Sequence, residues 1–564
     1  MTLQDTIARQ KLQRQQCLEA ILQSPARKKL IVAGPGTGKT YALEQVLKQR
    51  SGGNNLGMTF INNLVDDLER RLSAYAKIRT FHRYCKSILH QRHGRVELVP
   101  YLPKIIESDA RLLGRGLSGF GARFRDLDEH CPEVAFYLRR GDYYSVVGFD
   151  DSVYRLLMEL RADPNILPDF DQIIIDEYQD FNALEVALID ELEKKGPIVI
   201  VGDDDQAVYD DRRASPDHLR RKHSSGEYEV FQLPFCTRCP QVIVEATHAV
   251  VEAAQSRGYL RERLPKPFEC YLEAKQLDNA RYPRIVVAQC TVNRVITSYL
   301  AAEIGRIPPE DIAESWKDDY PTVLVVGPRQ YLREAEKQLL PTYPQLSYKP
   351  SLNPEYSMAE AYQLLLDDKD SNLGWRILTE VCLPWADRKR IVGATEDGTA
   401  MVGLLEPSFV LKHLGVVEVL RKLKNGDLID PMAEAGLRTT LADEFLEVTQ
   451  KFAPHKETEA PEADTNSPSI RLTSYKGCKG LSAGHVFLVG MNNGDMPKDP
   501  NHIRDVEISQ FIVALTRTRK QCHLISNKWL YRPQHSGLHK SAFVSWLPPG
   551  LTENRGHLCA ADLK

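Results

Sequence analysis

One stretch of the sequence, LIVAGPGTGKT at residues 30–40, constrains the fold more than any other. Its apolar start predicts a buried strand, its middle a glycine-rich turn, and the text after it, YALEQVLKQR, a helix. In such a loop, backbone N–H groups and the N-terminus of the helix surround phosphate oxygens. Ala33 takes the place of the pattern's first glycine, and it is small enough to leave the loop intact.

The residues of this loop predict a site for a nucleoside triphosphate and magnesium. We expect Lys39 to reach the β- and γ-phosphates and the Thr40 hydroxyl to bind Mg²⁺. The rest of the loop is expected to hold the phosphates, and its residues are Gly34, Pro35, Gly36, Thr37 and Gly38.

Short β-branched runs recur along the chain and predict the fold class. They are KKLIVAGPG, DQIIIDE, PIVIVGDDD, YPRIVVAQC, PTVLVVGPR and HVFLVGMNN. These runs are too short for isolated helices and too uniformly apolar for edge strands, so we interpret them as buried parallel strands that alternate with helices. They occur before residue 205, from 282 to 330 and from 485 to 490. The sequence therefore predicts an α/β protein with two parallel sheets and inserted helices.

Length and charge exclude some classes of protein. A chain of 564 residues predicts roughly three to four domains. With 73 Lys and Arg against 76 Asp and Glu, the chain is neither histone-like nor polyacidic, which leaves nucleic-acid binding open to clustered basic residues. The N-terminus has no apolar stretch after its charges, and no long apolar run occurs, so we expect a cytoplasmic protein without a membrane partner.

The eleven cysteines are scattered without the paired spacing of a disulfide-stabilised secreted domain, which predicts reduced thiols. CTRC at residues 236–239 lacks the second pair of ligands that a zinc site needs, and we interpret it as incidental.

DQIIIDEYQDF, residues 171–181, places two acids at the end of a predicted strand. Taken alone, such acids are more often solvated than functional. Next to a phosphate-binding loop, we expect Asp176 to bind Mg²⁺ directly or through water. We expect Glu177 to act as general base on the attacking water.

VGDDDQAVYDDRRAS, residues 201–215, allows three interpretations: a metal site, a solvated acidic loop, or a sensor built on Gln206. A metal site would need the side chains of Asp203, Asp204 and Asp205 to converge. We expect that an extended strand end prevents this, because neighbouring side chains point to opposite sides. The amide of Gln206 can both donate and accept, so the sequence favours a sensor of the γ-phosphate or its attacking water.

Eight segments follow one another in a recognisable order. They are AGPGTGKT, TFINNLVDDLERRL, IRTFHRYCKSIL, IIIDEYQD, VGDDDQAVY, LPFCTRCPQVI, LTSYKGCKGLSAGHVFLVG and VALTRTR. This order resembles the helicase motifs of the UvrD/Rep-like branch of superfamily 1, which is called superfamily 1A. The resemblance implies two RecA-like P-loop domains, with ATP and Mg²⁺ in the cleft between them and single-stranded or tailed DNA across their top. It also implies 3′ to 5′ translocation and often strand separation.

The resemblance gives roles to single residues. Arg238 and Arg517 match the family arginines that reach the γ-phosphate, and they complete a catalytic set with Lys39, Glu177 and Gln206. Gln16 matches a glutamine that reads adenine, with Gln15 as a rival, and Gly480 is expected beside the nucleotide. The residues expected along the DNA strand are Phe60, Asn62, Thr80, Phe81, His82, Tyr209, Arg212 and Lys476. The basic residues expected to neutralise DNA phosphates around them are Arg70, Arg71, Lys77, Arg79, Arg83 and Lys86.

The chain departs from the family pattern at four positions. Asp211 stands where the family has a large aromatic residue that stacks on a base, and Lys476 stands where it has a histidine. Thr237 replaces the tyrosine that stacks on adenine, and Ser482 replaces a glutamate. These changes leave the phosphate chemistry intact and the contacts of adenine, ribose and one DNA base open.

The expected domain organisation follows the motifs. Residues 1–90 and 166–240 form the first RecA-like domain, with a helical insertion at 91–165. Residues 241–349 and 466–545 form the second, with a helical insertion at 350–452. Residues 453–469, rich in Pro, Glu, Ser and Thr, form a flexible linker, and 546–564 form a C-terminal tail.

The sequence favours an ATP-dependent DNA helicase or translocase. One alternative is an ATP-switched DNA-binding subunit of a repair or genome-defence complex, with a nuclease or another subunit as protein partner and little unwinding of its own. The second alternative is a P-loop switch that uses ATP only to change partners and does not bind nucleic acid.

Overall fold

The computed structural model describes residues 2–59, 69–94, 96–349, 355–453, 464–531 and 537–562. The chain forms two compact units. The first unit comprises Met1–Phe81, Asn165–Ser351 and Ala463–Lys564, and the second comprises His82–Pro164 and Leu352–Glu462. Among the described residues, the helices are too short or too polar to cross a membrane.

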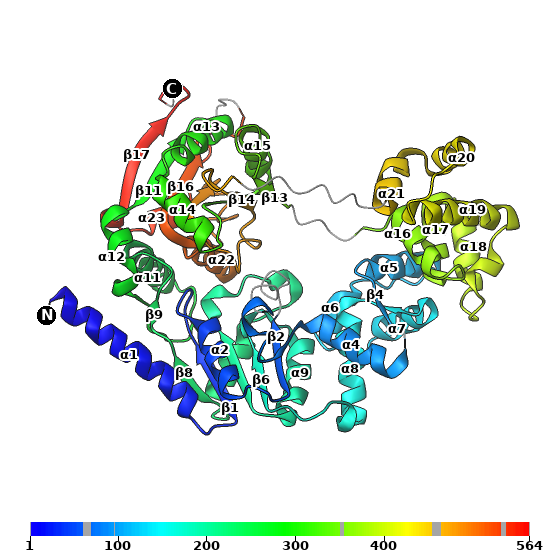
Figure 1. Ribbon diagram of the computed structural model, residues 1–564, viewed down its shortest axis with the longest axis horizontal. Coiled ribbons are helices and arrows are strands. Elements are labelled where there is room, and N and C mark those ends of the chain that lie inside the picture. Colours follow the sequence, from blue (N-terminus) through cyan, green and yellow to red (C-terminus); the bar gives the residue numbers. More distant parts are fainter. Residues whose placement is uncertain are drawn as a thin grey trace. The chain divides into compact units, whose positions relative to one another are not determined.

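The first unit contains a six-stranded parallel sheet built from residues 28–232 (Figure 1). Its strand order is β3-β2-β6-β7-β1-β8. The strands are β1 (Lys28–Val32), β2 (Asn55–Thr59), β3 (Lys77–Thr80), β6 (Gln172–Ile175), β7 (Ile198–Gly202) and β8 (Glu229–Gln232). The central strands β6 and β7 are buried along their whole length, which explains their unbroken Ile and Val runs.

Helices α1 (Leu3–Gln23), α2 (Lys39–Gln49), α9 (Ala183–Leu192) and α10 (Asp217–Ser224) belong to the same part of the chain. The start of α9 is encoded locally. Asn182 accepts a hydrogen bond from the backbone N–H of Glu185, whose carboxylate accepts one from the N–H of Asn182. This capping box satisfies two backbone donors that the first turn of a helix leaves open.

A second, seven-stranded parallel sheet follows in the same unit, in the order β13-β14-β12-β15-β16-β11-β17. The strands are β11 (Ile285–Cys290), β12 (Val323–Val326), β13 (Ser347–Tyr348), β14 (Ile470–Thr473), β15 (Ala483–Val489), β16 (Thr518–Asn527) and β17 (Thr552–Leu558). Thr552–Leu558, which lies within the C-terminal tail expected at 546–564, therefore forms an edge strand of this sheet. The two parallel sheets confirm the predicted α/β class.

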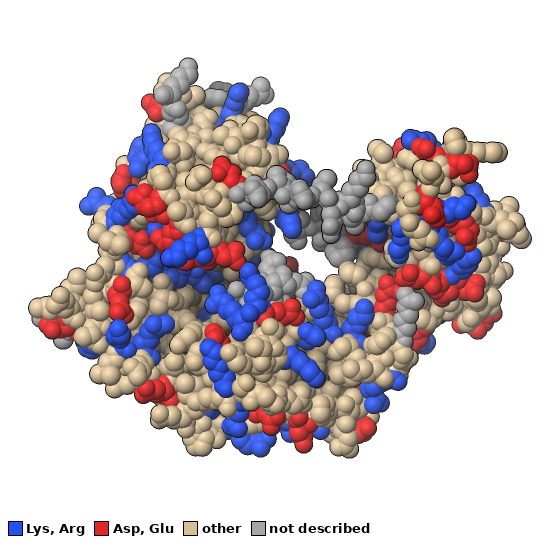
Figure 2. Space-filling view, viewed as in Figure 1, with Lys and Arg blue, Asp and Glu red and all other residues tan. Residues whose placement is uncertain are grey.

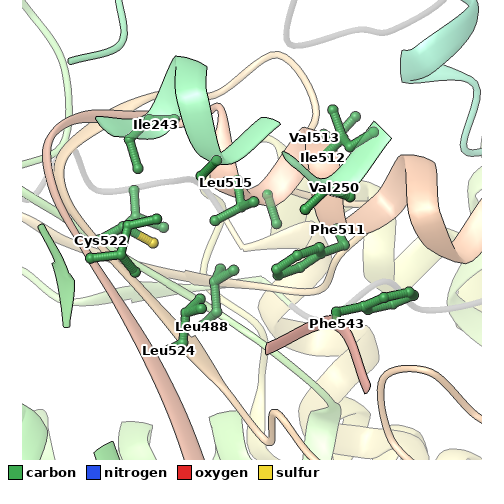
Figure 3. Packing of buried hydrophobic residues seen from close by; sticks show 14 of the residues in the cluster. Ile243, Val250, Leu488, Phe511, Ile512, Val513, Leu515, Cys522, Leu524 and Phe543 are labelled. Atoms are coloured by element: carbon green, nitrogen blue, oxygen red, sulfur yellow. The ribbon is translucent and has the colours of Figure 1, made fainter. Parts of the chain in front are cut away.

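The core of the second sheet is packed by α11 (Gln241–Ser256) and α22 (Asp505–Leu515) (Figure 3). Ile243 and Val250 of α11 meet Phe511, Ile512 and Leu515 of α22 in one buried cluster. The rings of Phe511 and Phe543 are stacked with centroids 5.1 Å apart. The helices α13 (Asn293–Ile304) and α15 (Arg329–Leu339) pack in a second cluster with strand residues such as Val325 and Phe487.

The second unit is almost entirely helical (Figure 1). One chain segment contributes α4 (Phe81–His93), α5 (Leu102–Leu112), α6 (Phe120–Arg125), α7 (Pro132–Tyr144) and α8 (Phe149–Ala162). The other contributes α16 (Met358–Asp367), α17 (Asn372–Cys382), α18 (Trp385–Ala394), α19 (Pro407–Lys424), α20 (Pro431–Leu441) and α21 (Phe445–Phe452). The two helical insertions therefore lie in one unit.

Buried ion pairs join these two segments. The carboxylate of Asp109 on α5 accepts hydrogen bonds from Arg140 on α7 and Arg376 on α17, both at 2.7 Å. The side chains of Asp109 and Arg376 are fully buried. A buried charge is costly unless it is paired, so these contacts specify how the two segments pack.

Candidate active site

The glycine-rich loop between β1 and α2 has the backbone that phosphate binding requires. Gly36 and Gly38 have φ values of 70° and 93°, in the left-handed region that favours glycine. A Cβ at Gly36 would lie 2.5 Å from the Cβ of Arg238, so this position needs glycine for space as well. Lys39, at the start of α2, donates hydrogen bonds to the carbonyl oxygens of Ala33 (3.1 Å) and Gly34 (3.3 Å).

A cleft of about 800 Å³ opens beside this loop, and residues from both sheets line it. Of the residues predicted for the nucleotide site, it is lined by Pro35, Gly36, Gly38, Lys39, Thr40, Asp176, Glu177, Gln206, Arg238, Gly480 and Arg517. Gly34 instead packs beneath Phe268, and Thr37 lines a smaller cleft nearby. Of the two rival glutamines, Gln15 lines that smaller cleft, whereas Gln16 lines neither of the two.

Two acids follow β6 and face the loop. Glu177 has a left-handed backbone (φ 54°), and its N–H donates to Asp176 Oδ1 at 2.9 Å. Burial and the neighbouring Glu177 raise the pKa of Asp176. Burial would also raise the pKa of Glu177, but the ammonium groups of Lys479 and Lys39 lower it, so this carboxylate stays ionised.

These groups fit a magnesium ion. The Asp176 carboxylate and the Thr40 hydroxyl both line the cleft and offer hard oxygen ligands, which Mg²⁺ prefers. A divalent cation beside Asp176 would stabilise the charge that burial destabilises. Three positive side chains, Lys39, Arg238 and Arg517, line the same cleft and suit a polyphosphate.

Gln206 connects the two sides of the cleft. Its amide nitrogen donates to Asp203 Oδ2 at 2.6 Å, and its side-chain oxygen accepts from Arg517 Nη2 at 3.2 Å. Its backbone carbonyl accepts from Lys479 Nζ at 2.7 Å. Arg517 and Lys479 lie in loops next to strands of the second sheet. Gln206, which follows a strand of the first sheet, therefore contacts segments of both sheets.

Arg517 and Arg238 bring positive charge to the cleft. Arg517 is held by the carbonyl oxygens of Val513 (2.8 Å) and Leu481 (3.1 Å). Burial and the nearby guanidinium of Arg238 lower the pKa of Arg517 to about 10. Two neighbouring cations repel each other, and an anion such as the γ-phosphate between them would relieve this repulsion.

Three charged residues near the site were not predicted from the sequence. Lys479 is 2% exposed and forms ion pairs with Asp180 (2.6 Å) and Glu177 (3.6 Å). Arg519 lines the cleft and donates to the hydroxyl of Ser482 at 3.0 Å. Lys479 and Arg519 lie within segments that resemble family motifs, but no pattern in the sequence singles them out.

The third residue is Lys266, and its contacts show that the expectation for the three aspartates was wrong. Asp203, Asp204 and Asp205 do converge, because Asp204–Gln206 forms a 3₁₀ turn instead of continuing the strand. Their carboxylates lie 2.8, 2.6 and 2.8 Å from the buried ammonium of Lys266. Their oxygens are close enough to bind a metal, but Lys266 already supplies the cation.

The residues predicted to follow the DNA strand are dispersed. Phe60 and Asn62 lie outside the described residues. Thr80 is buried, and Phe81 is fully buried against Phe181 (5.1 Å), which leaves its ring no face for a base. His82 begins the second unit and contacts Phe149 edge-on at 4.9 Å. The expectation that Phe81 stacks on DNA is therefore not supported.

The basic residues expected to neutralise DNA phosphates do not form one group in the structure. Arg70 and Arg71 line the nucleotide cleft, and Arg70 pairs with Asp319 at 2.6 Å. Arg79 pairs with Glu69 at 3.3 Å. On the face seen in Figure 2, Lys and Arg side chains are interspersed with Asp and Glu, in keeping with the net charge of −3.

Two departures from the family pattern meet in one contact. Lys476 Nζ lies 2.6 Å from Asp211 and 3.4 Å from Asp210, and Arg504 pairs with Asp210 at 3.2 Å. Tyr209 donates to the carbonyl of Lys476 at 3.4 Å. The exposed turn Asp210–Arg212, which contains Arg212, is thus linked to segments of the second sheet by ion pairs.

Comparisons with known proteins agree with this architecture. A family model described as an AAA domain matches residues 17–212. DNA helicase II of Haemophilus influenzae is 22% identical over 93% of this chain and 85% of its own length. DNA helicase II of Escherichia coli is 23% identical over 94% and 86%. The ATP-dependent DNA helicase UvrD1 of Mycobacterium tuberculosis is 24% identical over 42% of this chain and 38% of its own length. Together with the order of the motifs and the two parallel sheets, this similarity supports the resemblance to the UvrD/Rep-like branch of superfamily 1.

Proposed function

We propose that this chain is an ATP-dependent DNA helicase or translocase that moves 3′ to 5′ along single-stranded DNA. The observation that carries the proposal is the hydrogen bond of 3.2 Å between Arg517 Nη2 and Gln206 Oε1. It brings an arginine of the second sheet to a polar sensor that follows a strand of the first. A motor driven by ATP hydrolysis between two domains needs such a link. The DNA helicases similar to this chain support the same activity.

Bound ATP and Mg²⁺ would supply the phosphoanhydride bond and a cation that neutralises the phosphate charge. Lys39 and the backbone of the loop would hold the phosphates, and Thr40 and Asp176 would hold the metal. Glu177, fixed by a hydrogen bond of 2.6 Å from Gln179, would accept a proton from the attacking water.

Two guanidinium groups would then complete the site. Arg238 and Arg517 would stabilise the negative charge that develops on the phosphate oxygens during transfer. Departure of the phosphate after hydrolysis would remove this negative charge from the cleft and weaken the attraction that holds the arginines beside the glycine-rich loop. The cleft would open, and the DNA strand held by both sheets would advance.

The test is ATPase activity of the purified full chain with single-stranded DNA, with single-stranded RNA and with no nucleic acid. We expect strong stimulation by DNA and loss of turnover in Lys39→Ala. Unwinding of duplexes with a 3′ tail, and not of those with a 5′ tail, would support the polarity. Absence of DNA stimulation, or full activity of Lys39→Ala, would overturn the proposal.

A second candidate is an ATP-switched DNA-binding motor with little unwinding of its own. The ion pairs of Asp210 and Asp211 favour it, because they occupy Lys476 and Arg504, two cations that would otherwise attract phosphate. The buried ring of Phe81 points the same way. Ready unwinding of a 3′-tailed duplex by the isolated protein would exclude this candidate.

A further inference from the structure

A second cleft, of about 290 Å³, adjoins the nucleotide cleft. The two clefts share Arg14, Gly38 and Tyr41, so they meet at the N-terminus of α2, the end of the phosphate-binding loop. Much of the smaller cleft is lined by apolar or aromatic side chains, namely Leu18, Tyr41, Ala42, Leu233, Pro234, Phe235 and Tyr271. Its position and lining suit a flat, weakly polar group attached to a bound polyphosphate.

Strand pairing places Tyr271 beside Thr237, the position where the family pattern has its aromatic residue. Strands β9 (Phe235–Cys236) and β10 (Glu269–Cys270) are parallel, with Cys270 opposite Cys236. The next residues in register are Tyr271 and Thr237, and Tyr271 N–H donates to the Cys236 carbonyl at 2.9 Å. Thr237 itself is tied to the loop, since its N–H (2.9 Å) and its hydroxyl (3.2 Å) both donate to the Gly36 carbonyl.

The ring of Tyr271 is fixed in place. Its hydroxyl donates to Glu273, and its ring contacts Phe235 at 6.2 Å between centroids. The amide of Gln10 on α1 holds the backbone on both sides of this tyrosine. It donates to the Cys270 carbonyl and accepts from the Leu272 N–H, both at 3.1 Å. Tyr271 is 5% exposed and the Arg14 guanidinium lies over its ring, so a base would take the face that Arg14 now covers. The orientation of the ring is set before any ligand arrives, which reduces the entropy cost of stacking.

A planar cation completes the pocket. The guanidinium of Arg14 lies 5.1 Å from the centre of the Tyr271 ring and lines both clefts. Aromatic rings and guanidinium planes are the groups on which nucleobases stack, and stacking tolerates any base because every base has a π face.

We propose that Tyr271, with Arg14 beside it, is the residue that stacks on the base of the bound nucleotide, in place of Thr237. This inference rests on the proposed function, because it requires a nucleotide whose phosphates lie at the glycine-rich loop. Tyr271 and Thr237 follow neighbouring paired strands, so the ring of Tyr271 lies one strand away from the position of Thr237.

The test compares two probes on the full chain, Mg²⁺-ADP and magnesium tripolyphosphate, which has no base. Titration calorimetry would measure ADP binding, and displacement of a fluorescent nucleotide would measure tripolyphosphate binding. Tyr271→Leu keeps an apolar side chain but removes the ring. We expect it to weaken ADP binding about tenfold and to leave tripolyphosphate binding within about twofold. Tyr271→Phe keeps the ring without its hydrogen bond and should lose no more than about threefold.

The outcomes separate this inference from the proposed function. Equal affinity of Tyr271→Leu and the parent chain for ADP would overturn the inference, and so would an equal loss of ADP and tripolyphosphate binding. Lys39→Ala should weaken both probes, since it acts on the phosphates. If Lys39→Ala binds both probes like the parent chain, the proposed phosphate site fails, whatever Tyr271 does.

Discussion

At the scale of single residues, Lys479 is a buried cation that contacts groups on the opposite side of the cleft. It lies 2.6 Å from Asp180, 3.6 Å from Glu177 and 2.7 Å from the carbonyl of Gln206. Lys479→Met keeps the volume of the side chain and leaves two buried carboxylates without this cation. We expect the DNA-stimulated turnover of ATP to fall about 100-fold, as when one preorganised charge is removed from an active site.

The control for this substitution is Lys479→Arg, which keeps the charge and should retain more activity than Lys479→Met. Steady-state ATPase assays at saturating DNA measure both variants. Nucleotide binding through Lys39 should persist in each, because the phosphate loop is unchanged. Turnover of Lys479→Met equal to that of the parent chain would show that Lys479 does not support the catalytic groups.

His413 gives the second unit a stability that depends on pH. It is 2% exposed on α19, and its Nδ1 lies 2.7 Å from the Tyr362 hydroxyl. Burial, together with the charge of Lys412, lowers its pKa to about 4 from an ordinary value of 6.5. The unfolded chain therefore binds a proton at this site below pH 6.5, while the folded chain does so only near pH 4. Stability is lost as pH falls through this window.

At pH 5 the loss from His413 amounts to about 2 kcal/mol relative to pH 7. We expect His413→Gln to reduce the fall in melting temperature of the full chain between pH 7 and pH 5. Scanning calorimetry of both proteins at the two pH values provides the measurement. A parallel fall in the two proteins would mean that His413 is protonated equally in the folded and unfolded chains.

At the scale of elements, the turn Asp210–Arg212 competes with DNA for cations. Asp210 and Asp211 hold Arg504 and Lys476, and all four side chains are at least one-third exposed. Replacing both aspartates by asparagine should free the two cations to meet DNA phosphates. We expect binding of single-stranded DNA to tighten about threefold or more at low salt. The dependence of log affinity on log salt should steepen by about 0.7 for each phosphate gained.

Fluorescence anisotropy of a labelled oligonucleotide at several salt concentrations measures both quantities. Asp217→Asn is the matched control, because Asp217 is also exposed and pairs with Arg220 at 3.0 Å, but on α10. If the double variant binds DNA with the same affinity and the same salt slope, the turn does not face the DNA strand.

The elements also show how far sequence reasoning can reach. Strands such as β6 and β7 were predictable because burial on both faces demands an unbroken apolar run. The edge strand β17 was not, because TENRGHL is largely exposed and polar. Asp176 and Gln206 could be placed near the loop because each follows a strand of one parallel sheet, and such strands end at the same edge.

Contacts between distant segments were beyond prediction. Lys266 reaches its aspartates from 61 to 63 residues further along the chain, and Lys479 lies 302 residues from Glu177. No periodicity or local pattern connects such pairs. The expectation that the three aspartates do not converge was wrong because it assumed that β7 continues as an extended strand beyond Gly202. The chain instead turns at Asp204–Gln206.

At the scale of the whole molecule, the two chain segments of the second unit depend on one buried network. Arg376 on α17 donates to Asp109 on α5 (2.7 Å), to Glu380 (2.7 Å) and to Ser108 (3.1 Å). The segments enter the unit 270 residues apart in sequence, from His82 and from Leu352. Without Arg376, Asp109 would keep Arg140 and Glu380 would keep Arg388, but Asp109 would lose one of its two buried cations. Breaking a buried ion pair in this way costs about 3–5 kcal/mol.

Arg376→Met should therefore loosen the second unit and leave the nucleotide site intact. Hydrogen exchange of backbone amides reports this helix by helix. We expect exchange in α5, α7 and α17 to accelerate by about 100-fold or more, with α2 and α9 unchanged. Arg388→Met is the matched control, since Arg388 also contacts Glu380 (2.8 Å) but is 21% exposed, and such pairs contribute about 1 kcal/mol or less. Unaltered exchange in α5 of Arg376→Met would show that apolar packing, and not this network, joins the two segments.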